Sequence, residues 1–227
     1  MTALGRPRLH LRTTGSTNDR ARELAAAGAP HGTAVTAGVQ TAGRGRQGRT
    51  WTAPPGSSLL LSLVLREFDA LLPLRAGLAV AQVAGPQATV KWPNDVLVEG
   101  HKVAGILAEA RPQEGWTVLG IGLNVALDVR VLPPELHEVA GTLGRSPREL
   151  EPTLTELLHA LEAWLAEEVP VVVEALRERD ALLGRRLEWT GGAGVGAGVD
   201  DAGALRVRLD DGSIVALDTG EVRVRAA

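Results

Sequence analysis

The sequence contains no cysteine, no tyrosine and a single phenylalanine among its 227 residues. Without cysteine the protein cannot form disulfide bonds, use a thiolate nucleophile or hold a metal ion through sulfur. The longest apolar runs, at 59–65 and 169–173, are far shorter than the ~20 residues of a membrane span. The N-terminal sequence lacks the apolar segment of a signal peptide. We therefore expect a cytoplasmic protein that is not attached to a membrane.

The chain also lacks a large excess of charge of either sign. Its 24 basic and 27 acidic residues give a net charge of −3. This balance excludes a strongly basic nucleic-acid-binding protein. The hydrophobic content of 44% and the charged content of 22% are typical of a folded globular protein. A chain of this length buries roughly 70% of its unfolded surface, so it needs no disulfide or metal in order to fold.

Lysine and asparagine are scarce. Only two of the 24 basic residues are lysines, Lys91 and Lys102, and the only asparagines are Asn18, Asn94 and Asn124. A compact ammonium group and a planar guanidinium group are not interchangeable. A lysine kept in so arginine-rich a chain therefore indicates a position where arginine cannot serve. The alternative is that both lysines are surface residues retained by chance.

The hydrophobic pattern predicts strands and helices up to residue 183 and a change to short strands after it. Before residue 184 we expect strands at 8–12, 33–39, 57–65, 89–92, 95–98, 102–110 and 116–124. Helices are expected at 16–28, 74–84, 152–166 and 170–183. Later come short alternating strands joined by glycine-rich turns, at 185–190, 195–199, 205–209, 214–218 and 222–225. We predict a larger domain at 1–183 and a small β-barrel at 184–227 that packs on it.

A glycine- and arginine-rich segment at 40–51 is the strongest candidate for a ligand-binding loop. Its three glycines allow the backbone to approach a ligand closely. Arg44, Arg46 and Arg49 offer paired donors suited to phosphate or carboxylate. The segment is not a P-loop, because no Gly-Lys-Ser/Thr follows. A nucleic-acid-binding RGG tail is the alternative, but such tails are longer and repeat.

Three further segments carry polar groups that suit a ligand. Asn94-Asp95 places a carboxamide beside a carboxylate, which can bind Mg²⁺ or form a plain turn. The strand that contains Gly120 and Gly122 ends in Asn124, whose amide could bind a base edge or a ribose. The run 16–18 begins a helix, where it either caps the helix or binds a polar ligand group.

Taken in this order and at this spacing, these segments resemble the biotin–protein ligase family. The matching residues are Ser16-Thr17-Asn18, Gln40, Gly43–Arg49 with Trp51, Lys91–Asp95, Lys102 with Ala104–Leu107, and Gly120–Asn124. The C-terminal stretch 220–225 is similar to the small terminal barrel of that family. The resemblance covers nearly the whole chain. It implies an α/β (α+β) fold with a class II synthetase/biotin-ligase-like mixed sheet flanked by helices, plus a small C-terminal SH3-like β-barrel.

The resemblance also implies a two-step reaction. Biotin and ATP would give biotinyl-5′-AMP and pyrophosphate, with Mg²⁺ present, and an acceptor lysine would then displace AMP. Residues 1–183 would be the catalytic biotin/ATP-binding domain, with Lys102 and Arg46 as catalytic residues. The implied biotin-binding residues are Ser16, Thr17, Asn18, Gln40, Arg44, Gly45, Arg46, Lys102 and Gly105. The implied nucleotide-binding residues are Arg44, Arg46, Arg49, Trp51, Lys91, Asn94, Asp95 and Asn124, with Asn94 and Asp95 as magnesium ligands.

The partner that the resemblance implies is the biotin carboxyl carrier domain of a carboxylase. Neither lysine lies in a Met-Lys-Met context, so we expect the acceptor to be a separate protein. Only 15 residues precede Ser16, too few for the DNA-binding domain of bifunctional family members, so we expect no DNA binding. An exposed edge strand would permit a homodimer. The alternatives are a lipoate–protein ligase, which shares the adenylation chemistry, and a non-catalytic biotin-binding sensor.

Overall fold

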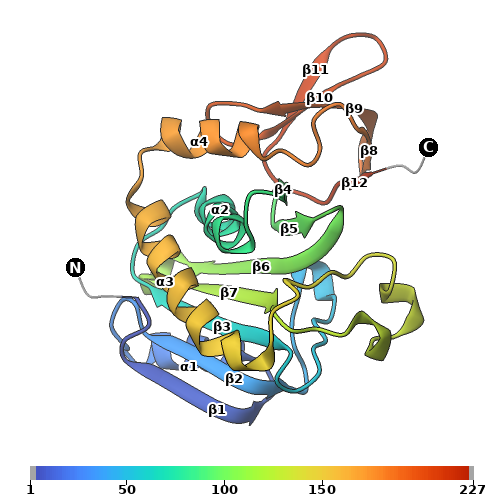
Figure 1. The fold of residues 1–227 in the computed structure, drawn as a ribbon. Coiled ribbons are helices and arrows are strands. Elements are labelled where there is room, and N and C mark those ends of the chain that lie inside the picture. Colours follow the sequence, from blue (N-terminus) through green and yellow to red (C-terminus); the bar gives the residue numbers. More distant parts are fainter. Residues whose placement is uncertain (1–3, 225–227) are drawn as a thin grey trace.

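Two β-sheets organise the protein, as the computed structural model shows for residues 4–224 (Figure 1). The larger sheet has seven strands in the order β1-β2-β3-β7-β6-β5-β4. These are β1 (Arg8–Thr14), β2 (Ala34–Gln40), β3 (Ser58–Leu65), β4 (Ala88–Lys91), β5 (Asp95–Val98), β6 (His101–Arg111) and β7 (Trp116–Asn124). The smaller sheet consists of β8 (Arg186–Trp189), β9 (Gly192–Val199), β10 (Leu205–Arg208), β11 (Ile214–Leu217) and β12 (Arg223–Val224).

Four α-helices accompany the sheets. They are α1 (Thr17–Ala26), α2 (Leu72–Ala84), α3 (Leu150–Ala166) and α4 (Val169–Glu178). Strand β1 runs parallel to β2, with α1 as the crossover between them, whereas all other neighbours in the large sheet are antiparallel. The mixed α/β sheet predicted from the sequence is therefore confirmed.

The middle of the large sheet is covered on both faces. Every residue of β3 is buried, as its nearly continuous apolar sequence predicts. On one face Val64 packs with Ala21 and Ala25 of α1. On the other face Leu63 belongs to the main core together with Leu78 of α2, and α3 packs on α2 (Figure 1). The helices therefore bury the middle of the sheet on both of its faces.

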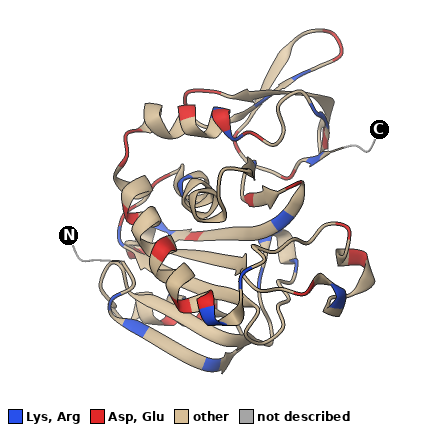
Figure 2. Cartoon of the chain, in the orientation of Figure 1, with Lys and Arg blue, Asp and Glu red and all other residues tan. Residues whose placement is uncertain are grey.

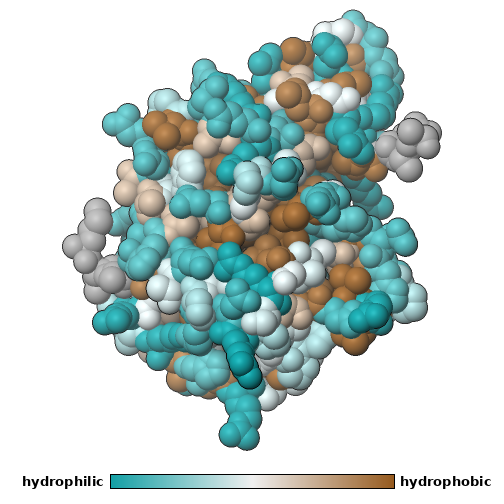
Figure 3. Space-filling model, in the orientation of Figure 1, coloured by the Kyte–Doolittle hydropathy of each residue, from teal (hydrophilic) through white to brown (hydrophobic). Residues whose placement is uncertain are grey.

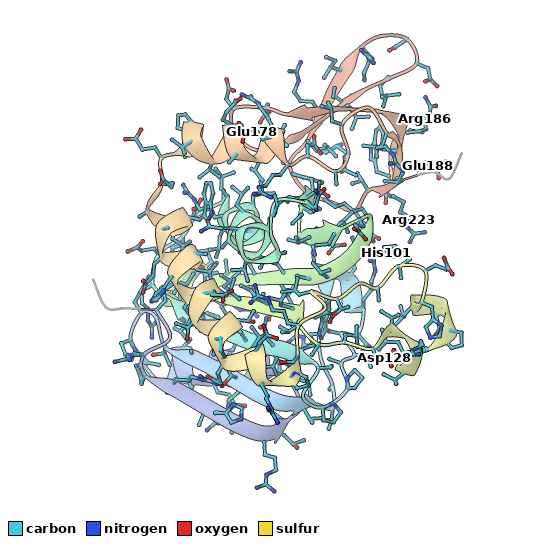
Figure 4. The ribbon with its side chains drawn as sticks, in the orientation of Figure 1. His101, Asp128, Glu178, Arg186, Glu188 and Arg223 are labelled. Atoms are coloured by element: carbon cyan, nitrogen blue, oxygen red, sulfur yellow. The ribbon has the colours of Figure 1, made fainter. Side chains whose placement is uncertain are left out.

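The smaller sheet is antiparallel and open rather than a closed barrel. Its order, β11-β10-β9-β8-β12, leaves β11 and β12 at opposite edges. Arg223 of β12 lies beside Glu188 of β8 (Figure 4). The sheet packs on the rest of the protein, because Leu187 and Val207 share one hydrophobic cluster with residues of the large sheet and α2. The exact domain boundary after residue 183 stays a prediction.

Helix α4 is shorter than the 170–183 predicted. It ends at Glu178, because the following backbone pairs with strand β4 instead. The Val90 amide donates to the Arg179 carbonyl at 2.7 Å, and the Ala181 amide donates to the Val90 carbonyl at 3.1 Å. The segment between the two sheets thus covers the outer edge of the large sheet.

The surface carries both signs of charge, as the balanced composition predicts. Figure 2 shows basic and acidic positions interspersed over helices and sheets. The face in Figure 3 is largely hydrophilic, with scattered hydrophobic residues. Within residues 4–224 no helix is long and apolar enough to cross a membrane.

Candidate active site

A cavity of about 120 Å³ lies where the start of α1, the loop after β2, the β4–β5 turn and the C-terminal segment meet. Its walls come from segments far apart in the sequence, including Ser16, Arg46, Asn94, Lys102 and Glu221. Every site residue predicted from the sequence lines this cavity, except Asn124. The fold therefore gathers the separate polar segments around one space.

Glycines form the floor of the cavity. Gly105 of β6 and Gly122 of β7 are register neighbours, and the Trp51 ring lies against both. A Cβ atom on Gly122 would lie 2.4 Å from Trp51 Cε2, and one on Gly105 would lie 3.0 Å from Trp51 Cζ3. The Trp51 ring nitrogen is buried without a hydrogen-bond partner. Only glycine leaves room here for a flat group against the sheet.

A chain of polar side chains closes one end of the cavity. The Thr17 amide donates to Gln40 Oε1 at 2.7 Å, and the hydroxyls of Thr17 and Ser62 are 2.8 Å apart. The Ser62 hydroxyl donates to Asn18 Oδ1 at 2.6 Å. Thr17, Asn18 and Ser62 are all buried. Buried polar groups fixed in this way suit the recognition of a small polar ring.

The three loop arginines each have an internal partner. Arg44 donates to Asp19 at 2.7 Å and to Glu109 at 3.0 Å, and the Asp19 bond raises the pKa of Arg44 above its usual range. Arg46 donates to Asn94 Oδ1 at 3.0 Å and to the Gly220 carbonyl at 2.9 Å. Burial lowers the pKa of Arg46.

Arg49 forms an ion pair with Glu221 at the C-terminal end of the chain. The Arg46 and Arg49 contacts tie the loop after β2 to the segment that follows β11. This segment therefore forms part of the cavity wall rather than a separate lobe.

The two lysines lie on the β4–β5–β6 side of the cavity. Lys102 Nζ is 2.7 Å from Asp95 Oδ1 and 5.7 Å from the centre of the Trp51 ring. Burial lowers the pKa of Lys91, and the neighbouring positive charges of Lys102 and Arg49 lower it further. The clustering of these rare residues at one site agrees with the prediction that they occupy special positions.

Asn124 lies outside the cavity lining, contrary to its expected place at the nucleotide. It is buried, its amide nitrogen donates to the Gly141 carbonyl at 2.9 Å, and its oxygen accepts from the Ser58 hydroxyl at 3.1 Å. In this structure the side chain joins the segment after β7 to the first residue of β3. Its contact with a nucleotide stays a prediction.

Sequence reasoning missed Ser62, Glu109 and Glu221. Ser62 looks like an ordinary small residue in an apolar strand. Only the packing of α1 on β3 shows that it faces Asn18 and Thr17. Glu221 is remote in sequence from the arginine it pairs with. Its place beside the Gly/Arg loop follows only from the packing of the two sheets.

A second cavity, of about 500 Å³, adjoins the first. It lies between the start of α2, the β4–β5 turn and the small sheet, and its walls are largely small or apolar, such as Ala108 and Ala204. Arg46 and Asn94 line both cavities. Trp92, Pro93, Ile106 and Leu107 also line both, so the two spaces meet at the β4–β5 turn and β6, beside Arg46.

The fold and the site define an α/β protein whose cavity joins buried polar side chains to several cationic ones. Comparison with known proteins makes this class specific. The model of the biotin/lipoate A/B protein ligase family matches residues 11–126, and the model of the biotin protein ligase C-terminal domain matches residues 194–225. The chain belongs to the biotin/lipoate A/B protein ligase family.

Curated relatives share much of the sequence. The biotin–[acetyl-CoA-carboxylase] ligase of Mycobacterium tuberculosis is 36% identical over 92% of this chain and 85% of its own length. The bifunctional ligase/repressor BirA of Bacillus subtilis is 41% identical over 59% of this chain and 45% of its own length. The match thus spans less than half of the Bacillus protein.

Solved structures agree with this assignment. The biotin protein ligase of Aquifex aeolicus, solved with biotin and ATP, superposes with a TM-score of 0.84 and 28% identity. That match covers 98% of this chain and 100% of the other. The Leishmania major ligase with biotinyl-5-AMP gives a TM-score of 0.62 at 25% identity, over 92% of this chain and 98% of the other. The predicted biotin-ligase-like fold is therefore confirmed.

Proposed function

We propose that the protein is an ATP-dependent biotin–protein ligase. The observation that carries this proposal is that the first cavity joins a buried polar end, a glycine floor and five cationic side chains. A polar ring, an apolar chain and a polyphosphate placed in one line would match these three parts in turn. Biotin joined to a nucleotide has this order of groups. The cations are Arg44, Arg46, Arg49, Lys91 and Lys102.

In the first step a carboxylate oxygen of biotin attacks the α-phosphorus of ATP. A new P–O bond forms, the bond to the leaving pyrophosphate breaks, and biotinyl-5′-AMP remains. Such a reaction needs positioning and charge neutralisation more than a protein nucleophile. Lys102 and Arg46 would neutralise charge at the junction. Arg44 and Arg49 would hold phosphate oxygens as the internal carboxylates release them.

Binding of the two substrates would divide between the ends of the cavity. Ser16, Thr17, Asn18 and Gln40 would bind the ureido ring of biotin, and Gly45 and Gly105 would let its chain pass close to the backbone. At the other end Trp51, Lys91, Asn94 and Asp95 would bind ATP. The closed loop would shield the mixed anhydride from water.

The donor set fits a magnesium ion that arrives with ATP. Mg²⁺ often takes only one or two protein carboxylates and completes its shell with phosphate and water oxygens. Asp95 provides one carboxylate and Asn94 one amide oxygen, and both face the cationic part of the cavity. No group of three or more His, Cys, Asp or Glu side chains that could hold a metal alone is found within residues 4–224. The ion would supply charge neutralisation on the phosphates.

In the second step the amine of an acceptor lysine attacks the acyl carbon of the adenylate. A C–N bond forms, the bond to the phosphate oxygen breaks, and AMP and a proton leave. The acceptor lysine would approach through the second cavity, which shares Arg46 and Asn94 with the first. We propose a biotin carboxyl carrier domain as the acceptor and the cytoplasm as the location, where ATP and carboxylases occur together.

Biotin rather than lipoate is the acid that we propose. The match of residues 194–225 to a biotin protein ligase C-terminal domain supports this choice, as do the full-length relatives, which are named for biotin.

ATP–pyrophosphate exchange by the purified full chain tests the proposal, with biotin, lipoate or no acid added. Exchange that requires biotin and Mg²⁺ is the expected result. Exchange with lipoate alone would assign the protein to the other branch of the family. Binding of biotin without any exchange would favour a non-catalytic sensor. A gel-shift assay separately tests the prediction that the chain does not bind DNA.

A further inference from the structure

Glu109 of β6 joins two parts of the site although it does not line the cavity. Its side chain is 20% exposed, and both carboxylate oxygens have partners. Oε2 accepts from Asn18 Nδ2 at 2.8 Å, and Oε1 accepts from Arg44 Nη2 at 3.0 Å. Arg22 Nη1 lies 3.5 Å from Oε1. One carboxylate thus holds the start of α1 and the Gly/Arg loop together.

The charge of Glu109 determines which way the Asn18 amide points. An ionised carboxylate only accepts hydrogen bonds, so the amide nitrogen of Asn18 must face it. The amide oxygen then faces Ser62, whose hydroxyl donates to it at 2.6 Å. The space around the amide is narrow, because a Cβ atom on Gly120 would lie 2.2 Å from Asn18 Oδ1. The orientation of Asn18 is therefore fixed from both ends.

The same order continues along the polar end of the cavity. The Ser62 hydroxyl has one proton and faces two acceptors, Asn18 Oδ1 at 2.6 Å and Thr17 Oγ1 at 2.8 Å. The Thr17 hydroxyl in turn donates to Gln40 Oε1 at 3.0 Å. The Thr17 amide fixes Gln40 through its Oε1 atom. The donor end of Gln40 consequently faces Gly43, where a Cβ atom would lie 3.0 Å from Nε2.

We infer that Glu109 is a positioning residue for the acid substrate. It sets the orientation of Asn18 directly and, through Ser62 and Thr17, supports that of Gln40. Its bond to Arg44 fixes the Gly/Arg loop relative to Asn18. This inference rests on the proposed function, since it names the residue that prepares the proposed biotin end of the site.

The substitution Glu109→Gln tests the charge while keeping the shape. A glutamine amide can donate as well as accept, so it no longer requires one orientation of Asn18, whereas Asp19 still anchors Arg44. Loss of one charge-assisted, oriented hydrogen bond should weaken biotin binding about tenfold. We expect the KM for biotin and the Kd from calorimetry to rise together, with the KM for ATP and kcat changing less than about threefold.

Glu114→Gln is the matched control. Its carboxylate accepts from the Trp116 ring nitrogen at 3.0 Å, beyond the end of β6, and Glu114 does not line the cavity. Biotin binding by this variant should equal that of the wild type. Glu109→Asp keeps the charge and should restore part of the lost affinity. Ser62→Ala should weaken biotin binding too, and combining it with Glu109→Gln should add less than the sum of both effects.

Two results would overturn the inference. One is a biotin Kd for Glu109→Gln within about twofold of the wild type. The other is an equal rise in the KM for ATP, which would indicate a general structural role. Failure of the proposed function is distinguishable, because a wild type that binds biotin without exchange refutes the ligase activity and leaves the calorimetric comparison intact.

Discussion

Replacing Gly122 by alanine should close the floor of the cavity. The new methyl carbon would lie 2.4 Å from Trp51 Cε2, 2.7 Å from Nε1 and 2.8 Å from Cζ2. Carbon atoms pack best at about 3.5–4.0 Å, so the indole must move by about 1 Å. Misplacement of this size in an active site can cost about 100-fold in rate. We expect kcat/KM for biotin-dependent pyrophosphate exchange to fall 10- to 100-fold.

The stability of this variant should change much less than its activity. Overpacking of a core costs about 1–3 kcal/mol, and Trp51 lies in a loop that can yield. For a chain of this size a loss of 1 kcal/mol lowers Tm by about 2–4 °C. Gly15→Ala is the matched control, since its Cβ atom would meet nothing within 4 Å.

A double mutant separates the clash from other effects. With Trp51→Leu as background, the atoms that Gly122→Ala would strike are absent, so the added methyl should cost less than about threefold. Activity of Gly122→Ala within twofold of the wild type would refute the idea that the glycine floor opens the site. An undiminished effect in the Trp51→Leu background would refute the proposed clash.

Three further substitutions test other parts of the site. Lys102→Ala should reduce biotin-dependent exchange by about 100-fold or more, because it removes charge stabilisation at the reacting groups, and near-normal exchange would contradict its catalytic role. Lys91→Gln should raise stability at neutral pH. Burial lowers the pKa of Lys91 in the folded protein. Between this lowered pKa and the ordinary lysine pKa, the unfolded chain binds more protons than the folded protein, so the free energy of unfolding of the wild type should rise with pH there. Denaturation across pH should show this rise in the wild type and lose it in the variant. Asn124→Ala should cost about 1–3 kcal/mol in chemical denaturation, since it leaves the Gly141 carbonyl and the Ser58 hydroxyl without their partner; an unchanged denaturation midpoint would show that these bonds are not stabilising.

Most of the helices and strands could be predicted from local sequence patterns. The β5–β6 turn was predictable because Glu99-Gly100 separates two strand patterns by two residues, the second of them glycine. In the structure both residues adopt the positive φ of a two-residue hairpin turn, 51° and 83°. The end of α4 was not predictable. The apolar pattern of 170–183 continues past Glu178, but pairing of Arg179 and Ala181 with Val90 ends the helix, and that contact depends on tertiary packing.

The residues of the candidate site also fall into those that the sequence predicts and those that it does not. Side chains with rare chemistry, such as Lys102 and Asn94, were visible because the rest of the chain avoids those residue types. Ser62 and Glu109 were not visible, since serine and glutamate are common and their roles depend on which neighbours the register of β3 and β6 brings to them.

The continuous hydrophobic cluster determines how the protein unfolds. Leu187 and Val207 of the small sheet share that cluster with Leu78 of α2. Apolar contacts that are shared in this way make a unit open and melt together. A break in the last forty or so residues would therefore remove the Arg46 and Arg49 contacts and loosen the core beneath the large sheet in one event. The C-terminal strands thus hold the cavity wall in place. Loss of ligand binding on heating should therefore coincide with loss of secondary structure.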